Sequence, residues 1–210
     1  MAETRIAVFV SGGGTNLQAL IDAEKAGKIT SGKISLVISS SAGAYAITRA
    51  SDNGIPCRVV SKKELGSQEA FEEKLLETLK EFDIELIVLA GFLSILSENF
   101  TSRYPERILN VHPSLIPSFC GEGFYGLKVH EAALSYGVKV TGATVHFVNE
   151  IPDGGRILLQ KAVYIEPDDT PETLQRRVMR EAEWILLPQA VEMISKLIAE
   201  KGESYEHIRN

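Results

Sequence analysis

Apolar and polar positions follow two patterns along the first half of the chain. The apolar runs 6–10, 34–39 and 86–90 are short and continuous, as in strands that are covered on both faces. Between them, apolar residues recur every three or four positions, for example from Phe71 to Leu75, which is typical of amphipathic helices. This alternation predicts an α/β protein with a mostly parallel sheet and helices on both faces.

The second half of the chain changes pattern. Residues 138–148 and 157–165 alternate apolar and polar side chains, as antiparallel strands do. We therefore expect the C-terminal part of the sheet to be antiparallel. The stretch 113–126 is rich in glycine and proline and predicts a long irregular loop. Loops of this length inside compact domains are often functional.

Two further helices are predicted, one in the middle of the chain and one near its C-terminal end. A short one is predicted over 95–103, before the strand at 108–111. The last helix is predicted to start with Pro171 at its first position and to run to about residue 200. Its periodicity turns Ile185 inward, and Pro188 predicts a kink because proline removes a helical hydrogen bond.

Composition narrows the class of protein. The chain has 210 residues, which suits one domain, predicted over 1–203, with a polar tail over 204–210. A net charge of −6 argues against nucleic acid or an anionic membrane as a partner. Only Cys57 and Cys120 are present, without metal spacing, and no apolar run approaches the ~20 residues that span a bilayer. We expect a soluble, cytoplasmic protein without a metal.

The sequence Ser-Gly-Gly-Gly-Thr-Asn at 11–16 lies between the first strand and its helix. Backbone N–H groups and the helix dipole converge on an anion at such a turn. The sequence is neither a P-loop nor a GxGxxG fingerprint, so it suits one terminal phosphate better than a pyrophosphate. The alternative is a tight strand–helix turn that binds nothing.

Asn110 and His112 stand two residues apart at the end of a predicted strand, so they project to the same side. Open α/β sheets bind ligands at the carboxyl ends of their strands. An amide donor beside an imidazole can stabilise the oxyanion of a tetrahedral intermediate. The alternative is a structural, hydrogen-bonded histidine.

Asp153 precedes two glycines, a pattern that by itself favours a hairpin turn. A functional aspartate here would lie near an imidazole, raise its pKa and keep it cationic at neutral pH. The spacing leaves both interpretations open.

Five segments together carry a family resemblance: 11–18, 89–93, 110–117, 144–148 and 153–155. In this order and spacing they resemble the phosphoribosylglycinamide formyltransferases, folate-dependent enzymes of purine synthesis. The resemblance covers nearly the whole chain and implies a single-domain, Rossmann-like formyltransferase fold. It implies 10-formyltetrahydrofolate as co-substrate and transfer of its formyl group to the amine of 5-phosphoribosylglycinamide, giving the N-formyl product and tetrahydrofolate.

The resemblance also implies roles for individual residues. The catalytic residues would be Asn110, His112 and Asp153, with Asp153 sustaining a protonated His112. The substrate would contact Gly14, Thr15, Asn16, Gly91, Pro113 and Glu183. The folate would be held by Leu93, Ser94, Ile95, Leu96, Asn110 and Gln68.

Some positions depart from the family pattern. Ser94 and Gln68 stand where many relatives have arginines that contact the acidic tail of the folate, and the loop 120–127 is longer than in most relatives. An extra residue upstream of the ribose-binding glutamate leaves two candidates for that role. The distance to Pro188 favours Glu183, and Glu181 is the competitor.

Other functions remain open at this point. A formyltetrahydrofolate hydrolase or a methionyl-tRNA formyltransferase would use the same motif, but the former usually has an extra N-terminal domain and the latter an extra basic C-terminal one. A non-catalytic phosphate-binding module is the alternative from another class. The small-molecule enzyme is favoured, as a monomer or homodimer. His146 is interpreted as a structural, hydrogen-bonded residue, and His130, at the start of a helix, is a weaker candidate.

Overall fold

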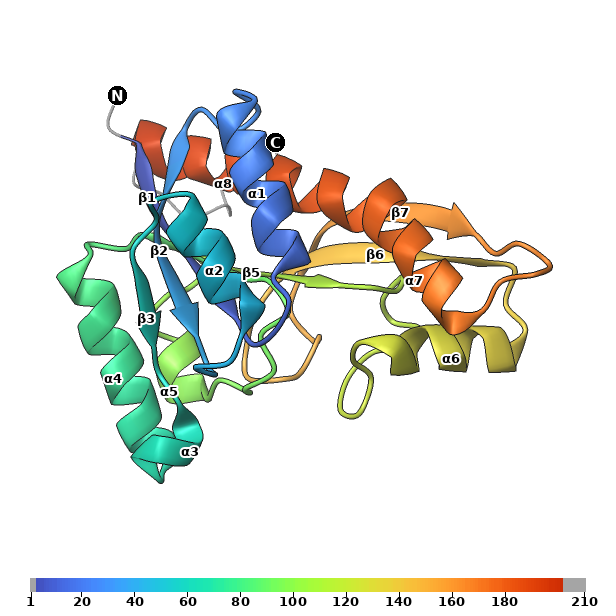
Figure 1. The fold of residues 1–210 in the computed structure, drawn as a ribbon, viewed down its shortest axis with the longest axis horizontal. Coiled ribbons are helices and arrows are strands. Elements are labelled where there is room, and N and C mark those ends of the chain that lie inside the picture. Colours follow the sequence, from blue (N-terminus) through green and yellow to red (C-terminus); the bar gives the residue numbers. More distant parts are fainter. Residues whose placement is uncertain (1–2, 202–210) are drawn as a thin grey trace.

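The computed structural model describes residues 3–201, in which a single seven-stranded sheet runs through the molecule (Figure 1). The strand order is β3-β2-β1-β4-β5-β6-β7. The strands are β1 Thr4–Val10, β2 Gly32–Ser39, β3 Cys57–Val59, β4 Leu86–Leu89, β5 Ile108–His112, β6 Val140–Phe147 and β7 Ile157–Tyr164.

The first five strands are parallel, and β6 and β7 are antiparallel to their neighbours. The prediction of a mostly parallel sheet with an antiparallel C-terminal part is therefore confirmed. The chain order reverses between β1 and β4, where open α/β sheets leave a crevice at their carboxyl ends. The turns after β1, β4 and β5 all open into this crevice.

Helices cover both faces of the sheet, as predicted. They are α1 Thr15–Lys25, α2 Tyr45–Asp52, α3 Lys62–Leu65, α4 Gln68–Glu81, α5 Glu98–Thr101, α6 Leu127–Tyr136, α7 Pro171–Val178 and α8 Trp184–Lys201. One core cluster joins the sheet to α1, α2, α7 and α8. The other joins its opposite face to α4 and α5 through large side chains such as Phe71 and Phe100.

Two expectations about helices are wrong in detail. The helix predicted over 95–103 is reduced to the single turn α5, Glu98–Thr101. The last helix contains a π-helical turn, η1, at Met179–Glu183, and then continues as α8 through Pro188. A π turn inserts one residue, which rotates all later positions. Leu186 and Leu187 consequently face the core, and Ile185 is half exposed instead of inward.

The predicted tail 204–210 lies outside the described residues. The boundary of the domain at residue 203 accordingly stays a prediction. Within the described part of the chain, no helix is long and apolar enough to cross a membrane.

Candidate active site

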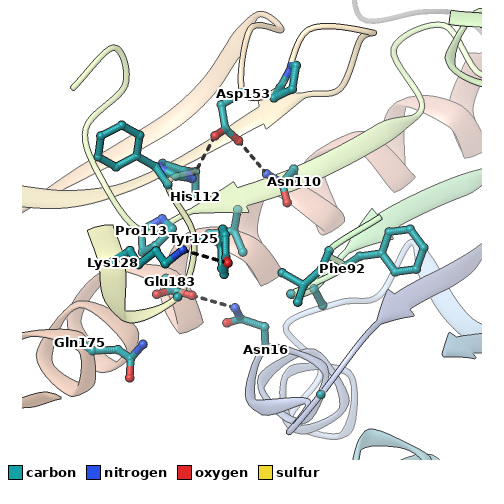
Figure 2. A pocket seen from close by; sticks show the side chains of 18 of the residues that line it. Asn16, Phe92, Asn110, His112, Pro113, Tyr125, Lys128, Asp153, Gln175 and Glu183 are labelled. Atoms are coloured by element: carbon teal, nitrogen blue, oxygen red, sulfur yellow. Dashed lines mark hydrogen bonds and ion pairs between the residues drawn. The ribbon is translucent and has the colours of Figure 1, made fainter. Parts of the chain in front are cut away.

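A cavity of about 780 Å³ opens where the turns after β1, β4 and β5 converge (Figure 2). Its lining comes from segments far apart in the sequence. These are the glycine-rich turn 12–16, residues 90–93, residues 110–113, the loop 121–126, the Asp153 turn and the helical segment from Gln175 to Glu183. All the predicted substrate residues, Gly14, Thr15, Asn16, Gly91, Pro113 and Glu183, lie in this lining.

The glycine-rich turn lines the cavity, and two of its carbonyl groups are held by α2. The carbonyl of Gly12 accepts a hydrogen bond from the Ala46 amide, and that of Gly13 accepts one from Arg49 Nε at 2.8 Å. Gly14 is the N-cap residue of α1 and lies in the left-handed region (φ 70°). No side chain caps the N-terminus of this helix. The first N–H groups of α1 are thus available to an anion.

Asn16 and Glu183 meet across the floor of the cavity. Asn16 Nδ2 donates to Glu183 Oε2 at 2.7 Å, and both side chains are buried (Figure 2). Burial raises the pKa of Glu183 to about 7 despite this hydrogen bond. Asn16 Oδ1 is buried without a partner among the described residues, so it can accept a hydrogen bond from a ligand hydroxyl.

The π turn explains why Glu183, and not Glu181, lies in the cavity. The extra residue in η1 brings both Ala182 and Glu183 to the buried side, whereas Glu181 is exposed. Between the two candidates, the structure thus places Glu183 in the cavity. π turns of this kind are frequent at functional sites.

The opposite end of the cavity gathers the three predicted catalytic side chains (Figure 2). His112 Nδ1 lies 3.3 Å from Asp153 Oδ2, and Asn110 Nδ2 donates to Asp153 Oδ1 at 3.4 Å. Asn110 and His112 project together from the carboxyl end of β5, as the two-residue spacing predicts. Asp153 approaches from the turn between β6 and β7.

A strained turn holds Asp153 in place. The amide of Gly154 donates to the Ile151 carbonyl at 2.9 Å, and Asp153 has φ 55°, a conformation that few non-glycine residues adopt. A Cβ on Gly155 would lie 1.8 Å from the Phe147 carbonyl oxygen, so only glycine fits there. The Asp-Gly-Gly sequence therefore both forms a turn and directs a carboxylate at His112.

Burial has opposite consequences for the charges of the two partners. It lowers the pKa of His112, and the nearby charge of Asp153 and the Phe119 carbonyl only partly offset this effect. Burial raises the pKa of Asp153, but contacts with His146, His112 and the Gly121 amide lower it more, so that it lies below the usual value. Asp153 therefore raises the pKa of His112, as expected, but burial opposes it, and the expectation that His112 is cationic at neutral pH stays a prediction.

The long loop contacts both catalytic groups directly. His112 Nε2 lies 2.8 Å from the Phe119 carbonyl oxygen, and the Gly121 amide donates to Asp153 Oδ2 at 2.9 Å. A substrate oxygen that accepts the Nε2 hydrogen must therefore take the place of the Phe119 carbonyl. The predicted loop 113–126 is irregular throughout and ends at α6.

A second, smaller cavity of about 100 Å³ adjoins the first and shares Asn110 and Asp153 with it. Ser94, Ile95 and Leu96 line it together with residues 148–152, and Leu93 and Ile95 line the main cavity. Gln68 lines neither cavity; its Nε2 donates to the Ile95 carbonyl at 3.1 Å and to Glu72. Gln68 thus anchors the backbone of the segment predicted to hold the folate, and its direct role stays a prediction.

Sequence reasoning missed several residues of the cavity. Lys128, the cationic side chain among the described lining residues, donates to the Tyr125 hydroxyl at 3.0 Å. His130 is buried in the lining, with neither ring nitrogen bonded to a described residue, and burial lowers its pKa to about 4. No periodicity marks these positions, because the irregular loop determines where they lie.

No group of three or more His, Cys, Asp or Glu side chains in residues 3–201 is arranged to hold a metal ion. The predicted absence of a metal stays a prediction.

Residues 4–191 match the formyl transferase family model, and the chain therefore belongs to the formyl transferase family. It is 40% identical over 192 residues to phosphoribosylglycinamide formyltransferase of Haemophilus influenzae, with 91% of this chain and 87% of that protein covered. The crystal structure of phosphoribosylglycinamide formyltransferase from Bacillus halodurans superposes with a TM-score of 0.84 at 38% identity, covering 95% of this chain and 97% of that one.

Longer relatives contain the same domain as one part. The chain is 44% identical over 203 residues to the trifunctional purine biosynthetic protein adenosine-3 of Gallus gallus, covering 96% of this chain. It spans 19% of the length of that relative.

Proposed function

We propose that this protein transfers the formyl group of 10-formyltetrahydrofolate to the amine of 5-phosphoribosylglycinamide. The observation that carries this proposal is the convergence of Asn110, His112 and Asp153 at one end of a cavity whose other end is an uncapped helix N-terminus. The names of the relatives at about 40% identity support the same reaction in purine synthesis.

The cavity suits a phosphorylated sugar with an amine at its far end. The amide groups of Gly14, Thr15 and Asn16 would bind the phosphate. Glu183 would accept hydrogen bonds from the ribose hydroxyls, and the unpaired Asn16 Oδ1 is a further acceptor for them. Gly91 and Pro113 would then line the path of the glycinamide toward His112.

The folate segment meets the reacting groups from the second cavity. Leu93, Ser94, Ile95 and Leu96 would hold the reduced folate, with Gln68 fixing their backbone. The folate supplies the formyl carbon and the nitrogen that departs from it. The shared residues Asn110 and Asp153 lie where the contents of the two cavities would meet.

The side chains would act as follows. As the amine attacks the formyl carbon, negative charge develops on the formyl oxygen, and Asn110 Nδ2 and a protonated His112 donate hydrogen bonds to it. The developing charge favours protonation of His112, which burial alone disfavours. The attacking amine loses a proton, and the departing folate nitrogen gains one through His112, Asp153 or a water molecule.

An acceptor assay tests this function. Purified protein is mixed with 10-formyltetrahydrofolate and either 5-phosphoribosylglycinamide or water alone, and tetrahydrofolate and the N-formyl product are quantified. We expect product only with the amine. Release of formate at the same rate without the amine would indicate a hydrolase, and no turnover of either kind would indicate a non-catalytic binding module.

The remaining predictions concern the partners, the cellular location and the oligomeric state of the enzyme. We infer small-molecule substrates, without nucleic acid or membrane partners, in the cytoplasm. Whether the enzyme is a monomer or a homodimer can be measured by analytical ultracentrifugation.

A further inference from the structure

His146 is a buried polar residue that the mechanism above does not use. It stands on β6 directly opposite Asn110 of β5 in the antiparallel register, and it is 1% exposed. Side chains at such paired positions lie within contact distance. His146 also lines the smaller cavity together with Asn110 and Asp153.

The hydrogen bonds of His146 determine where its proton lies. Nδ1 lies 2.8 Å from the carbonyl oxygen of Phe147, which can only accept, so Nδ1 carries a hydrogen. Nε2 lies 3.1 Å from Asn110 Nδ2 and 3.5 Å from Asp153 Oδ1, so the amide is its nearer partner. An amide nitrogen only donates, so Nε2 accepts the hydrogen bond from Asn110 Nδ2 as a bare ring nitrogen.

This hydrogen bond fixes the orientation of the Asn110 amide. If the amide were flipped, its oxygen would face the carboxylate of Asp153, which would be repulsive. With the nitrogen on this side, Nδ2 donates one hydrogen to His146 at 3.1 Å and the other to Asp153 at 3.4 Å. The second contact is at the long limit for a hydrogen bond, so that hydrogen is the one available to a substrate oxygen.

We propose that His146 is a positioning residue for the transfer reaction: as a neutral Nδ1–H imidazole, it holds the Asn110 amide with one N–H directed at the formyl oxygen. The inference rests on the function proposed above. It assigns His146 no contact with the substrate, so its loss should lower kcat and leave substrate binding intact. Misplacement of a catalytic group by about 1 Å can cost about a hundredfold in rate.

Three variants test the proposal in the acceptor assay. His146→Phe keeps a flat ring but removes the acceptor, and we expect kcat to fall about tenfold or more with KM for the phosphorylated substrate unchanged. His146→Gln can place an oxygen near the former Nε2 and should recover most of this loss. His146→Leu serves the same purpose as the Phe variant if that variant does not fold, as judged by circular dichroism.

A double-mutant cycle separates positioning from a structural role. In an Asn110→Ala background, His146→Phe should cause no further loss of kcat, because the amide that it positions is already gone. Multiplicative losses in the double variant would overturn the proposal, as would a His146→Phe enzyme with normal kcat. Absence of formyl transfer in the unmodified protein would instead refute the proposed function itself.

A measurement on the unmodified protein tests the protonation state without any variant. ¹⁵N NMR of the histidine side chains distinguishes the Nδ1–H tautomer, the Nε2–H tautomer and the imidazolium. The proposal predicts Nδ1–H for His146 at neutral pH. An Nε2–H or doubly protonated ring would contradict it, because neither leaves an acceptor for Asn110.

Discussion

The two ends of the main cavity are built from different groups. At one end, the turn 12–16 and the uncapped start of α1 line the cavity, and α2 holds two carbonyl groups of this turn. At the other end, the side chains of Asn110 and His112 each lie within 3.4 Å of Asp153, and His112 and Asp153 also contact the long loop.

This difference teaches how the site divides its tasks. Backbone amides are fixed by the fold and cannot change protonation state, so they suit the holding of a permanent anion. Side chains with perturbed pKa values suit a step in which charge appears and disappears. Substitutions at the first end should therefore weaken binding, and substitutions at the second should lower kcat.

The largest effect is expected at Asp153. In Asp153→Asn, kcat should fall at least about a hundredfold while the affinity for the phosphorylated substrate is largely retained. The change also removes an influence that raises the pKa of His112, so that pKa should move further down. Because the proposed mechanism requires protonated His112, activity should be lost with rising pH at a lower pH than in the unmodified enzyme. A kcat–pH profile that keeps its position would contradict the coupling.

A second effect concerns stability and pH at the binding end. The pKa of Glu183 rises from 4.5 to about 7 on folding, so the folded chain retains a proton that the unfolded chain has already released in this window. Stability should thus fall as pH rises from about 4.5 to about 7 and level off above. Glu183→Gln removes this dependence. The free energy of unfolding of the variant, relative to that of the unmodified protein, should therefore rise by roughly 2–3 kcal/mol from pH 5 to pH 8. Urea unfolding of both proteins at pH 5 and pH 8 measures these free energies. The same difference between variant and unmodified protein at both pH values would exclude a raised pKa of Glu183.

The third prediction tests the backbone end through Gly14. A Cβ at this residue would lie 2.7 Å from Ala46 Cβ, and its φ of 70° strains any other residue. Gly14→Ala should lose about 2 kcal/mol of stability and bind the phosphorylated substrate at least about tenfold more weakly. Gly13→Ala is the matched control for stability, because nothing lies within 4 Å of its Cβ. Equal stability of the two variants would contradict the packing argument.

The smallest effect is expected at Lys128, an exposed residue of the cavity lining. Removing this charge from the cavity in Lys128→Ala should raise KM for the phosphorylated substrate by about fivefold and leave kcat unchanged. The effect should weaken at high salt. Lys80→Ala on α4, exposed and outside the cavity lining, is the control. An identical KM in both variants would show that Lys128 does not contribute.

Much of the fold could be predicted because local patterns determine it. The apolar runs became β1, β2 and β4, and the alternating segments became β6 and β7. The turn 11–16 and the pair Asn110 and His112 followed from strand-end patterns, whereas Asp153 and Glu183 were assigned by the family resemblance.

Other features depend on contacts that no local pattern records. The π turn at Met179–Glu183 exposes Ile185, since one additional residue rotates the rest of the helix. Burial, which a sequence does not report, lowers the pKa of His112 and opposes the effect of Asp153. The contacts of Phe119 and the tautomer of His146 likewise arise from tertiary structure alone.

The most direct test measures kcat and substrate affinity separately for His112→Ala. Single-turnover formyl transfer gives the rate, and isothermal titration calorimetry with 5-phosphoribosylglycinamide gives Kd. We expect a rate at least about a hundredfold lower with Kd within about threefold of the unmodified protein. A near-normal rate would contradict the account, because it would remove His112 from the chemistry that the three side chains are proposed to perform.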